Sequence, residues 1–178
     1  MTESNEKPAE TMWAGRYIAI RRQGRWEYAE RNNDISAAVI FAVDGEGMVL
    51  LVEQYRVPLG RNCLELPAGL VGDEDAGESI ADAARRELEE ETGYRATMVE
   101  ERGEFFASPG MTSESFTLVV ATGLVRTGDG GGDSDENIIV HRVALSEVEG
   151  FVAMKRREGI AIDAKMLMLL SSGILATL

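Results

Sequence analysis

The sequence predicts an α+β domain, and three observations support that class. Short runs of alternating apolar and polar residues, typical of half-buried strands, recur from about residue 17 to residue 143. A single strongly helical stretch, near residues 79–92, interrupts them and ends at a glycine. The strands and helices do not follow a regular βαβ rhythm, so we expect a sandwich built on a mixed sheet.

The chain divides into three ranges. Residues 1–14 are polar and acidic and are expected to form a flexible leader, and residues 15–178 to form one domain, in which residues 15–36 make N-terminal strands and residues 37–178 the main fold. In chain order we expect strands at 17–20, 26–30, 37–43 and 48–53, a helix at 79–92, strands at 105–106 and 116–121, a flexible acidic loop at 128–137, a strand at 138–143, a helix at 146–157 that opens with a capping box at Ser146 and Glu149, and a last helix at 163–170 capped by Asp163.

Composition excludes several classes of protein. The 178 residues carry a net charge of −13, from 18 basic and 31 acidic side chains, which argues against a general nucleic-acid surface. A phosphate substrate stays compatible with this charge if a divalent cation supplies the positive charge. The first residues, MTESNEKPAETMW, contain no apolar segment of signal-peptide type, and no run in the sequence is long enough to span a membrane, so neither is expected. The single Cys63 cannot form an intramolecular disulfide, so we expect a cytoplasmic protein.

The helix at 79–92 places acidic side chains where a solvated helix would not. At about 100° per residue, its apolar side chains share one arc of roughly 140°. Glu87 and Glu91 project inside this arc, between Ala83 and Leu88, and Glu90 lies at its edge. Carboxylates directed towards a core are costly unless something compensates them. A hard cation with oxygen ligands is the compensation that this spacing favours.

The spacing around the helix carries a resemblance to a known family. Gly72, five residues, Glu78, seven residues and the run Arg86-Glu-Leu-Glu-Glu-Glu-Thr-Gly93-Tyr94 match every fixed position of the Nudix box. The chain is therefore similar to Nudix hydrolases, which implies an α/β/α sandwich with a mixed central sheet. It also implies magnesium-dependent hydrolysis of a nucleoside diphosphate linked to another group.

The resemblance assigns roles to individual residues. Two or three Mg²⁺ ions, with Mn²⁺ as a substitute, would be held by Glu87, Glu90, Glu91 and the backbone carbonyl of Ala68. Arg86 would orient this cluster, and its spacing allows an ion pair with Glu90. Structural roles in the box fall to Glu78, which braces the loop and helix, and to Gly72 and Gly93.

One departure concerns the loop before the helix. In similar pyrophosphatases the glycine after Pro67-Ala68 is itself the first box position, whereas here Gly69 precedes Gly72 by three residues. Either glycine could be the structural equivalent, and the sequence leaves the choice open.

Features outside the box resemble the ADP-ribose pyrophosphatase branch. Pro109, followed by Gly110, lies sixteen residues after Gly93, which is the offset that marks this branch. Glu53-Gln54-Tyr55-Arg56 also resembles it, and Arg56 would face the phosphates of the substrate. The alternative for Pro109 is an ordinary turn residue, and the alternative for Arg56 is a surface ion pair.

The N-terminal strands add aromatic residues to the resemblance. Similar enzymes exchange these strands across a homodimer and stack the adenine between rings, which would involve Tyr17, Trp26 and Arg31. The alternative is that these aromatic side chains belong to the core.

The base that activates the attacking water has two candidates. Glu136 lies in an acidic loop that resembles the mobile loop of these enzymes, and Glu114 follows the Pro109 turn. His141 is expected to be structural.

The expected reaction converts ADP-ribose to AMP and ribose 5-phosphate. A GDP-mannose or broad nucleoside diphosphate-sugar hydrolase is the alternative within enzymes, and a non-catalytic ADP-ribose sensor is the alternative of another class. No nucleic acid or membrane partner is expected.

Overall fold

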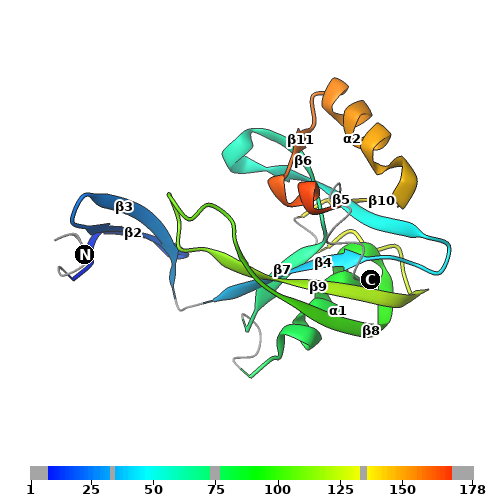
Figure 1. Ribbon diagram of the computed structural model, residues 1–178, viewed down its shortest axis with the longest axis horizontal. Helices are drawn as coiled ribbons and strands as arrows, with labels where there is room; N and C mark the ends of the chain where they lie inside the picture. The colour runs from blue at the N-terminus through cyan, green and yellow to red at the C-terminus, as the bar shows by residue number, and fades with distance from the viewer. Residues whose placement is uncertain (1–7, 33–34, 73–76, 133–135, 170–178) are drawn as a thin grey trace.

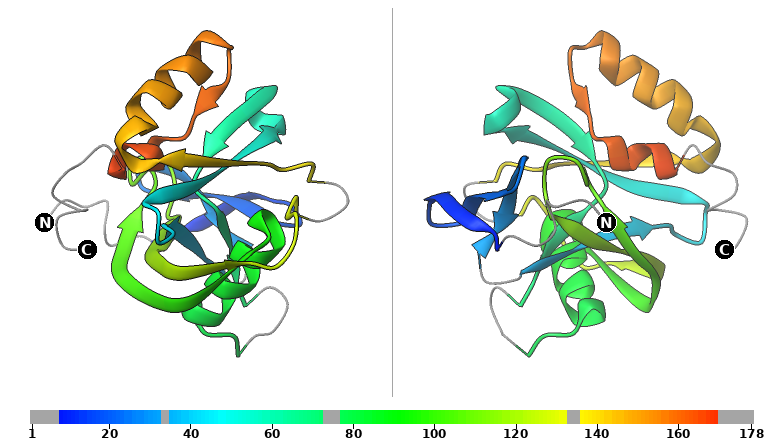
Figure 2. Two further views of the ribbon diagram at one scale, coloured as in Figure 1. Left: turned by 90° about the vertical axis from the view of Figure 1, so that its right-hand side faces the viewer. Right: turned by 60° about the vertical axis from the view of Figure 1, so that its left-hand side comes forward.

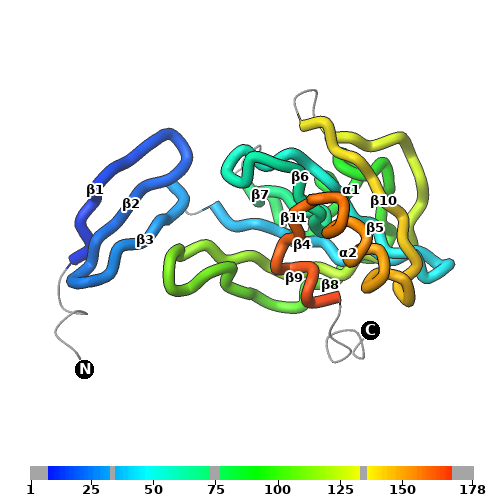
Figure 3. The backbone as a smooth tube through the Cα atoms, turned by 90° about the horizontal axis from the view of Figure 1, so that it is seen from above, coloured from blue at the N-terminus to red at the C-terminus, as the bar shows by residue number. Residues whose placement is uncertain are grey.

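The computed structural model describes residues 8–32, 35–72, 77–132 and 136–169 (Figure 1). Three strands, β1 (Glu10–Ala14), β2 (Ile18–Gln23) and β3 (Trp26–Arg31), form an antiparallel sheet in the order β1-β2-β3. This N-terminal sheet stands to one side of the rest of the molecule (Figure 3).

The leader predicted at residues 1–14 is wrong over its second half, where β1 forms. All five residues of β1 are exposed, and the strand pairs only with β2 through a register shift between Thr11 and Trp13. With no buried face, its sequence has no alternating pattern that would have signalled a strand. Residues 1–7 lie outside the described residues.

Two four-stranded sheets form the body. One has the order β7 (Ala68–Val71), β4 (Ser36–Ala42), β9 (Ser115–Arg126), β8 (Tyr94–Phe106), and the other β10 (Ile139–Ala144), β5 (Met48–Arg56), β6 (Arg61–Glu65), β11 (Ala161–Ile162). The β4–β9 and β6–β11 pairs are parallel and the remaining pairs are antiparallel. The predicted mixed pairing is confirmed, but the strands form two sheets.

Helices cover the outside of this sandwich. Helix α1 (Ile80–Thr92) packs on the sheet that contains β4, and α2 (Val148–Arg157) lies beside the sheet that contains β5 (Figure 2). Short 3₁₀ turns occur at η3 (Val57–Leu59), η4 (Leu145–Glu147) and η5 (Ala164–Met168). No helix among the described residues has the length and apolar character needed to cross a membrane.

Both predicted C-terminal helices need correction. Ser146 lies within η4, and α2 begins after Glu147 without a side-chain cap, so the predicted capping box is wrong. The Asp163 cap is confirmed, since its side chain accepts from the backbone N–H of Lys165, but the element it opens is 3₁₀. Its last predicted residue, Leu170, lies outside the described residues.

Two apolar clusters hold the layers together. Val39 and Phe41 point from β4 into a cluster shared by both sheets, α2 and η5. Ala38 and Ile40 point from the other face of β4 into a second cluster that includes Leu88 of α1. This alternation along one strand is what gives the α/β/α arrangement its two cores.

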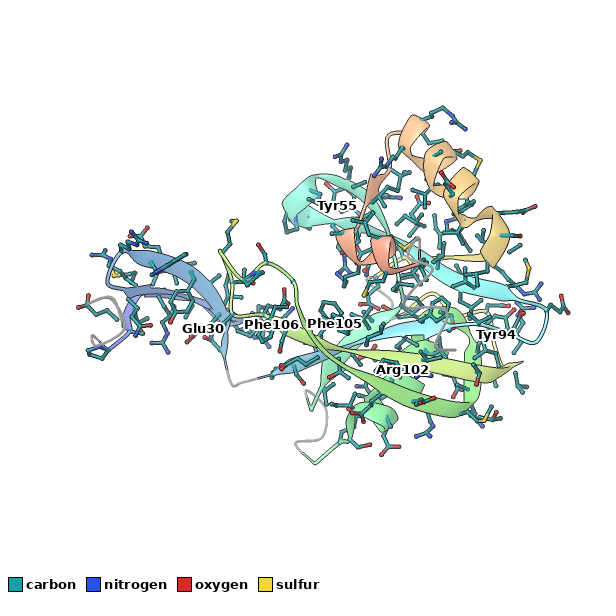
Figure 4. The ribbon with its side chains drawn as sticks, in the orientation of Figure 1. Glu30, Tyr55, Tyr94, Arg102, Phe105 and Phe106 are labelled. Atoms are coloured by element: carbon teal, nitrogen blue, oxygen red, sulfur yellow. The ribbon has the colours of Figure 1, made fainter. Side chains whose placement is uncertain are left out.

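The N-terminal sheet contacts the body at the β8–β9 turn. The backbone N–H of Ala29 donates to Met111 at 2.9 Å, and that of Ser113 donates to Ala29 at 3.0 Å. Figure 4 shows Glu30 of β3 and Phe106 of β8 on the two sides of this junction. The junction brings the end of β3 to the edge of the cavity described next.

Candidate active site

A cavity of about 390 Å³ opens between the two sheets and α1. Its walls contain many of the residues predicted to be functional, from both ends of the sequence: Arg31, Arg56, Ala68, Gly69, Glu87, Glu91, Glu114 and Glu136.

Helix α1 brings two of its acidic residues, Glu87 and Glu91, to this cavity. The side chain of Ser79 accepts from the N–H of Asp82 and begins the helix, and Gly93, at φ 74°, ends it in the left-handed conformation. Leu88 is buried against the sheet, and Glu91 is buried beside it, so the predicted inward direction of this carboxylate is confirmed.

Glu91 is the most buried acid of the cavity, with 5% of the residue exposed. Its carboxylate accepts from the backbone N–H of Ala68 at 3.1 Å. Burial, followed by the charges of Glu87 and Glu136, raises the pKa of Glu91 to about 8, although the Ala68 hydrogen bond and Arg56 oppose the change. A cation beside Glu91 would offset the free-energy cost of ionising this buried carboxylate.

Arg86 organises the acidic residues around it. Its guanidinium donates to both carboxylate oxygens of Glu78, at 3.0 and 3.1 Å, to Glu87 at 2.9 Å and to Glu90 at 3.2 Å. Glu78 first, and then Glu87, raise the pKa of Arg86 above its ordinary value, against the opposing effect of burial. The predicted Arg86–Glu90 ion pair is confirmed.

The predicted metal ligands are only partly gathered. Glu87 and Glu91 line the cavity, whereas the Glu90 side chain is about half exposed, at 48%, and is not among the residues lining it. Among the described residues, no three acidic, histidine or cysteine side chains converge closely enough to form a ready-made metal site. The Glu90 carboxylate is instead paired with Arg86, at 3.2 Å.

Both glycines of the loop before α1 are physically required. A Cβ on Gly69 would lie 1.9 Å from Cδ of Glu87, so only glycine lets β7 approach that carboxylate. Gly72 has φ 82°, which favours glycine for conformational reasons. Gly69 is thus the glycine in contact with the acidic cluster, and Gly72 the one that turns the chain.

Cationic side chains also line the cavity, among them Arg56 and Lys165. Arg56 donates to both oxygens of the buried Glu65 carboxylate, at 2.7 and 2.9 Å. Lys165 pairs with Asp163 at 2.6 Å. Such pairs hold the cations in position where a phosphate group could reach them.

Sequence reasoning missed Glu65, Gln54 and Lys165 as lining residues. Glu65 stands between Leu64 and Leu66 in an apolar stretch, and a buried acid in such a stretch was an available signal. Lys165 gave no local signal, because the β6–β11 pairing brings η5 back from the end of the chain.

The two candidate bases differ in their surroundings. Arg31 donates to Oε1 of Glu114 through Nη2 at 2.6 Å and Nε at 3.0 Å. Glu136 is exposed and lines the cavity. Residues 133–135 of the acidic loop lie outside the described residues.

Four predicted substrate-binding residues are not among the described residues that line the cavity. Tyr17 and Trp26 are exposed on the N-terminal sheet, at 67% and 49%, so they are not core residues of this chain. Pro109 and Gly110 are exposed in the turn closed by the N–H of Met111 donating to Ser108. His141, expected to be structural, contacts Glu53 at 3.1 Å outside the cavity.

Residues 33–168 match the NUDIX domain, which is most of the chain. The chain belongs to the Nudix family. Its match to nudix hydrolase 2 of Caenorhabditis elegans is 38% identical over 146 residues, 72% of this chain and 61% of that protein.

Two further relatives have named activities. The ADP-ribose pyrophosphatase of Bacillus subtilis is 38% identical over 112 residues, covering 62% of this chain and 59% of the relative. The GDP-mannose pyrophosphatase of Cronobacter sakazakii is 34% identical over 152 residues, which cover 81% of this chain and 74% of the relative. The chain thus spans less than two thirds of some relatives and about three quarters of another.

A solved structure supports the fold. The crystal structure of an ADP compounds hydrolase superposes with a TM-score of 0.67 over 82% of this chain and 80% of that one, at 24% identity. The Nudix fold predicted from the sequence is therefore confirmed.

The family implies a divalent metal, and the residues present fit one. Gly69 leaves the space that the Glu87 carboxyl group occupies at the cavity, and Glu91 is buried with neighbouring carboxylates that disfavour its charge. Carboxylate and backbone carbonyl oxygens, which Glu87, Glu91 and Ala68 bring to this cavity, are the ligand type that suits Mg²⁺.

Proposed function

We propose that the protein hydrolyses the pyrophosphate of a nucleoside diphosphate sugar, with ADP-ribose as the substrate. The observation that carries this proposal is one cavity whose lining includes the acids Glu87, Glu91 and Glu136 together with the cations Arg56 and Lys165. Acids suit a metal-bound pyrophosphate and cations suit its free oxygens, so both are needed in one space. The relatedness to ADP-ribose pyrophosphatases supports the choice of substrate.

The acidic side of the cavity would hold the metal. Glu87, Glu90, Glu91 and the carbonyl of Ala68 are the proposed ligands for two or three Mg²⁺ ions, with Mn²⁺ as a substitute. Bound magnesium supplies charge neutralisation and a lower pKa for the attacking water. Arg86 donates to both Glu87 and Glu90 and so would orient these two ligands.

The protein's own groups would then position the reaction. Arg56, fixed by Glu65, and Lys165 would bind phosphate oxygens. Water would add to one phosphorus while the bridging P–O bond breaks, which yields AMP and ribose 5-phosphate. Glu136 would accept the proton of that water, with Glu114 as the second candidate.

We also propose a cytoplasmic homodimer. Tyr17 and Trp26 are exposed and outside the cavity of their own chain, and a second copy would be needed to place such rings over an adenine. Arg31 would meet the substrate at the junction, and Pro109 and Gly110 would shape the facing turn. Native mass tests the dimer, and a monomer at micromolar concentration would contradict it.

GDP-mannose is the second candidate substrate. A GDP-mannose pyrophosphatase is 34% identical across 81% of this chain, a longer match than that to the ADP-ribose enzyme of Bacillus subtilis.

A substrate panel tests the proposal. The purified chain with Mg²⁺ would be given ADP-ribose, GDP-mannose, diadenosine polyphosphate and NADH, and we expect AMP and ribose 5-phosphate from the first. Glu87→Gln and Glu91→Gln should abolish turnover with the fold intact. Glu89→Gln, on the same helix but paired with Arg95, is the matched control.

Three results would decide between the alternatives. Faster hydrolysis of GDP-mannose would transfer the assignment to that substrate. Tight binding of ADP-ribose without turnover would indicate the sensor. Full activity of Glu91→Gln would overturn the metal assignment.

A further inference from the structure

The segment after β9 crosses the end of the acidic helix. We call residues 127–132, Thr-Gly-Asp-Gly-Gly-Gly, the glycine strap. Residues 128–132 were expected to belong to a flexible loop, yet the strap makes ordered backbone contacts with the end of α1. The N–H of Gly131 donates to the carbonyl of Glu91 at 2.8 Å, and that of Gly132 donates to Glu90 at 3.0 Å.

These hydrogen bonds satisfy groups that a helix cannot satisfy itself. The last carbonyls of an α-helix lack partners in their own helix. Here the strap provides donors for two of them, and the N–H groups of Thr127 and Gly128 donate to Gly93 at 2.7 and 3.1 Å. The strap is thus fixed to the backbone of the residues whose side chains are acidic.

Glycine is required where the strap and helix meet. A Cβ on Gly130, at φ 67°, would lie 2.4 Å from the carbonyl carbon of Thr92 and 2.6 Å from the carbonyl oxygen of Glu91. A Cβ on Gly93 would in turn lie 2.4 Å from the carbonyl oxygen of Gly128. These obstacles are backbone atoms, so no side chain can rotate away to make room.

The end of the strap touches Glu136. A Cβ on Gly132, at φ 70°, would lie 2.2 Å from Oε2 of Glu136 and 2.9 Å from Cδ1 of Ile138. The chain also returns to the strap, because the N–H of Ile138 donates to the carbonyl of Gly131 at 3.1 Å. The strap therefore lies between α1 and the Glu136 carboxylate, and it contacts both.

We propose that Gly130 and Gly132 are positioning residues that set where the Glu136 carboxylate stands relative to the acidic side chains of α1. Gly130 allows the strap to lie directly on the helix end, and Gly132 leaves the space that the Glu136 carboxylate occupies. This inference rests on the proposed function, in which Glu136 accepts the proton of the attacking water.

The test compares two glycine variants of similar backbone geometry. Gly132→Ala should lower kcat for ADP-ribose at least tenfold with KM changed less than twofold. Gly47→Ala is the matched control, since Gly47 has φ 75° and nothing within 4 Å of a Cβ in its surface turn. It should lose comparable thermal stability and keep its kcat.

A double-mutant cycle separates positioning from general damage. If Gly132 acts through Glu136, adding Gly132→Ala to Glu136→Gln should cause no further loss of kcat. Gly130→Ala should lower kcat as well, and should expose the amides of Gly131 and Gly132 to faster hydrogen exchange. Wild-type kcat in Gly132→Ala, or an equal further loss in the Glu136→Gln background, would overturn the inference.

A spectroscopic measurement keeps the two proposals distinguishable. The side-chain carboxyl ¹³C resonance of Glu136 should shift in Gly132→Ala and stay in place in Gly47→Ala. If the wild type hydrolyses none of the nucleotide sugars, the proposed function fails and this resonance alone decides the positioning claim. An unchanged resonance would refute it.

Discussion

Arg31 and Glu114 form an ion pair with two hydrogen bonds at the boundary between the N-terminal sheet and the cavity. Both Nη2 and Nε of Arg31 donate to the same oxygen of Glu114, at 2.6 and 3.0 Å. Arg31 ends β3 and Glu114 precedes β9, so this pair joins two parts of the chain that are 83 residues apart. The Glu114 carboxylate is thus already engaged by a cation where it lines the cavity.

The first prediction separates the two candidate bases. Glu136→Gln should lower kcat by roughly 10²–10⁴, the usual contribution of a general base, because an amide cannot accept the proton of the attacking water. Glu114→Gln should lower kcat less than tenfold, since the amide still accepts a hydrogen bond from Arg31. Steady-state kinetics with ADP-ribose and saturating Mg²⁺ measures both. The reverse order of effects would identify Glu114 as the base.

The second prediction concerns the contact between β7 and α1. Gly69→Ala places a Cβ 1.9 Å from Cδ of Glu87 and must displace that carboxylate. We expect a loss of kcat of at least tenfold and a higher Mg²⁺ concentration for half-maximal activity. Gly45→Ala, which meets nothing within 4 Å in its surface turn, is the control and should match the wild type. Unchanged Mg²⁺ dependence in Gly69→Ala would contradict the proposed role of Glu87.

The third prediction is a pH dependence of the metal-free protein. Burial first, and then Glu87 and Glu136, raise the pKa of Glu91 from 4.5 to about 8. The folded chain therefore holds a proton that the unfolded chain releases between these two pH values. Stability must then fall as the pH rises from about 4.5 to 8. The loss is on the order of a few kcal/mol, at about 1.4 kcal/mol per pH unit of difference.

Urea unfolding in EDTA at pH 5, 7 and 9 measures this effect. Glu91→Gln should be more stable than the wild type at pH 9 and should show a flatter dependence on pH. Adding Mg²⁺ to the wild type near pH 7 should release protons, which calorimetry in two buffers of different ionisation enthalpy detects. Equal pH slopes in wild type and Glu91→Gln would show that Glu91 is not the group responsible.

The acidic helix could be predicted from the sequence because its information is local. The spacing of Glu87, Glu91 and Leu88 fixes which side chains share a face of α1, and the Arg86–Glu90 pair follows from the same geometry. The burial of Glu91 could then be predicted from one assumption, that the apolar arc of the helix faces the core.

The rest of the cavity depends on contacts between distant segments. Lys165 reaches it because β11 pairs with β6, and Glu114 is fixed by Arg31 from the N-terminal sheet. The glycine strap was expected to be flexible, since a run of glycines carries no pattern that reveals its hydrogen bonds to α1. Strand β1 was missed for a related reason, because all of its residues are exposed.

The fourth prediction concerns a buried acid that lies outside the cavity. Glu53 on β5, 4% exposed, accepts a hydrogen bond from Asn62 at 2.9 Å and contacts Lys155 of α2 at 2.9 Å and His141 at 3.1 Å. Burial alone would raise the pKa of Glu53, but these three partners lower it from 4.5 to about 2. The network thus ties α2 to the sheet through an ionised carboxylate.

The lowered pKa of Glu53 makes the folded protein more stable at neutral pH than at acidic pH. The contribution of Glu53 to stability is fully present above pH 4.5 and is lost as the pH falls towards 2. Lys155→Met should leave the buried carboxylate with one charged partner fewer and cost about 3 kcal/mol at pH 7. The cost should be smaller at pH 3, because Lys155 no longer lowers the pKa of Glu53 in the variant and the carboxylate can take up a proton. Glu158→Gln removes only the exposed partner of Lys155, and should cost less than about 1 kcal/mol. Urea unfolding of the three proteins at both pH values measures these differences. A Lys155→Met cost that is the same at pH 3 and pH 7 would show that loss of packing, and not the Glu53 charge, accounts for it.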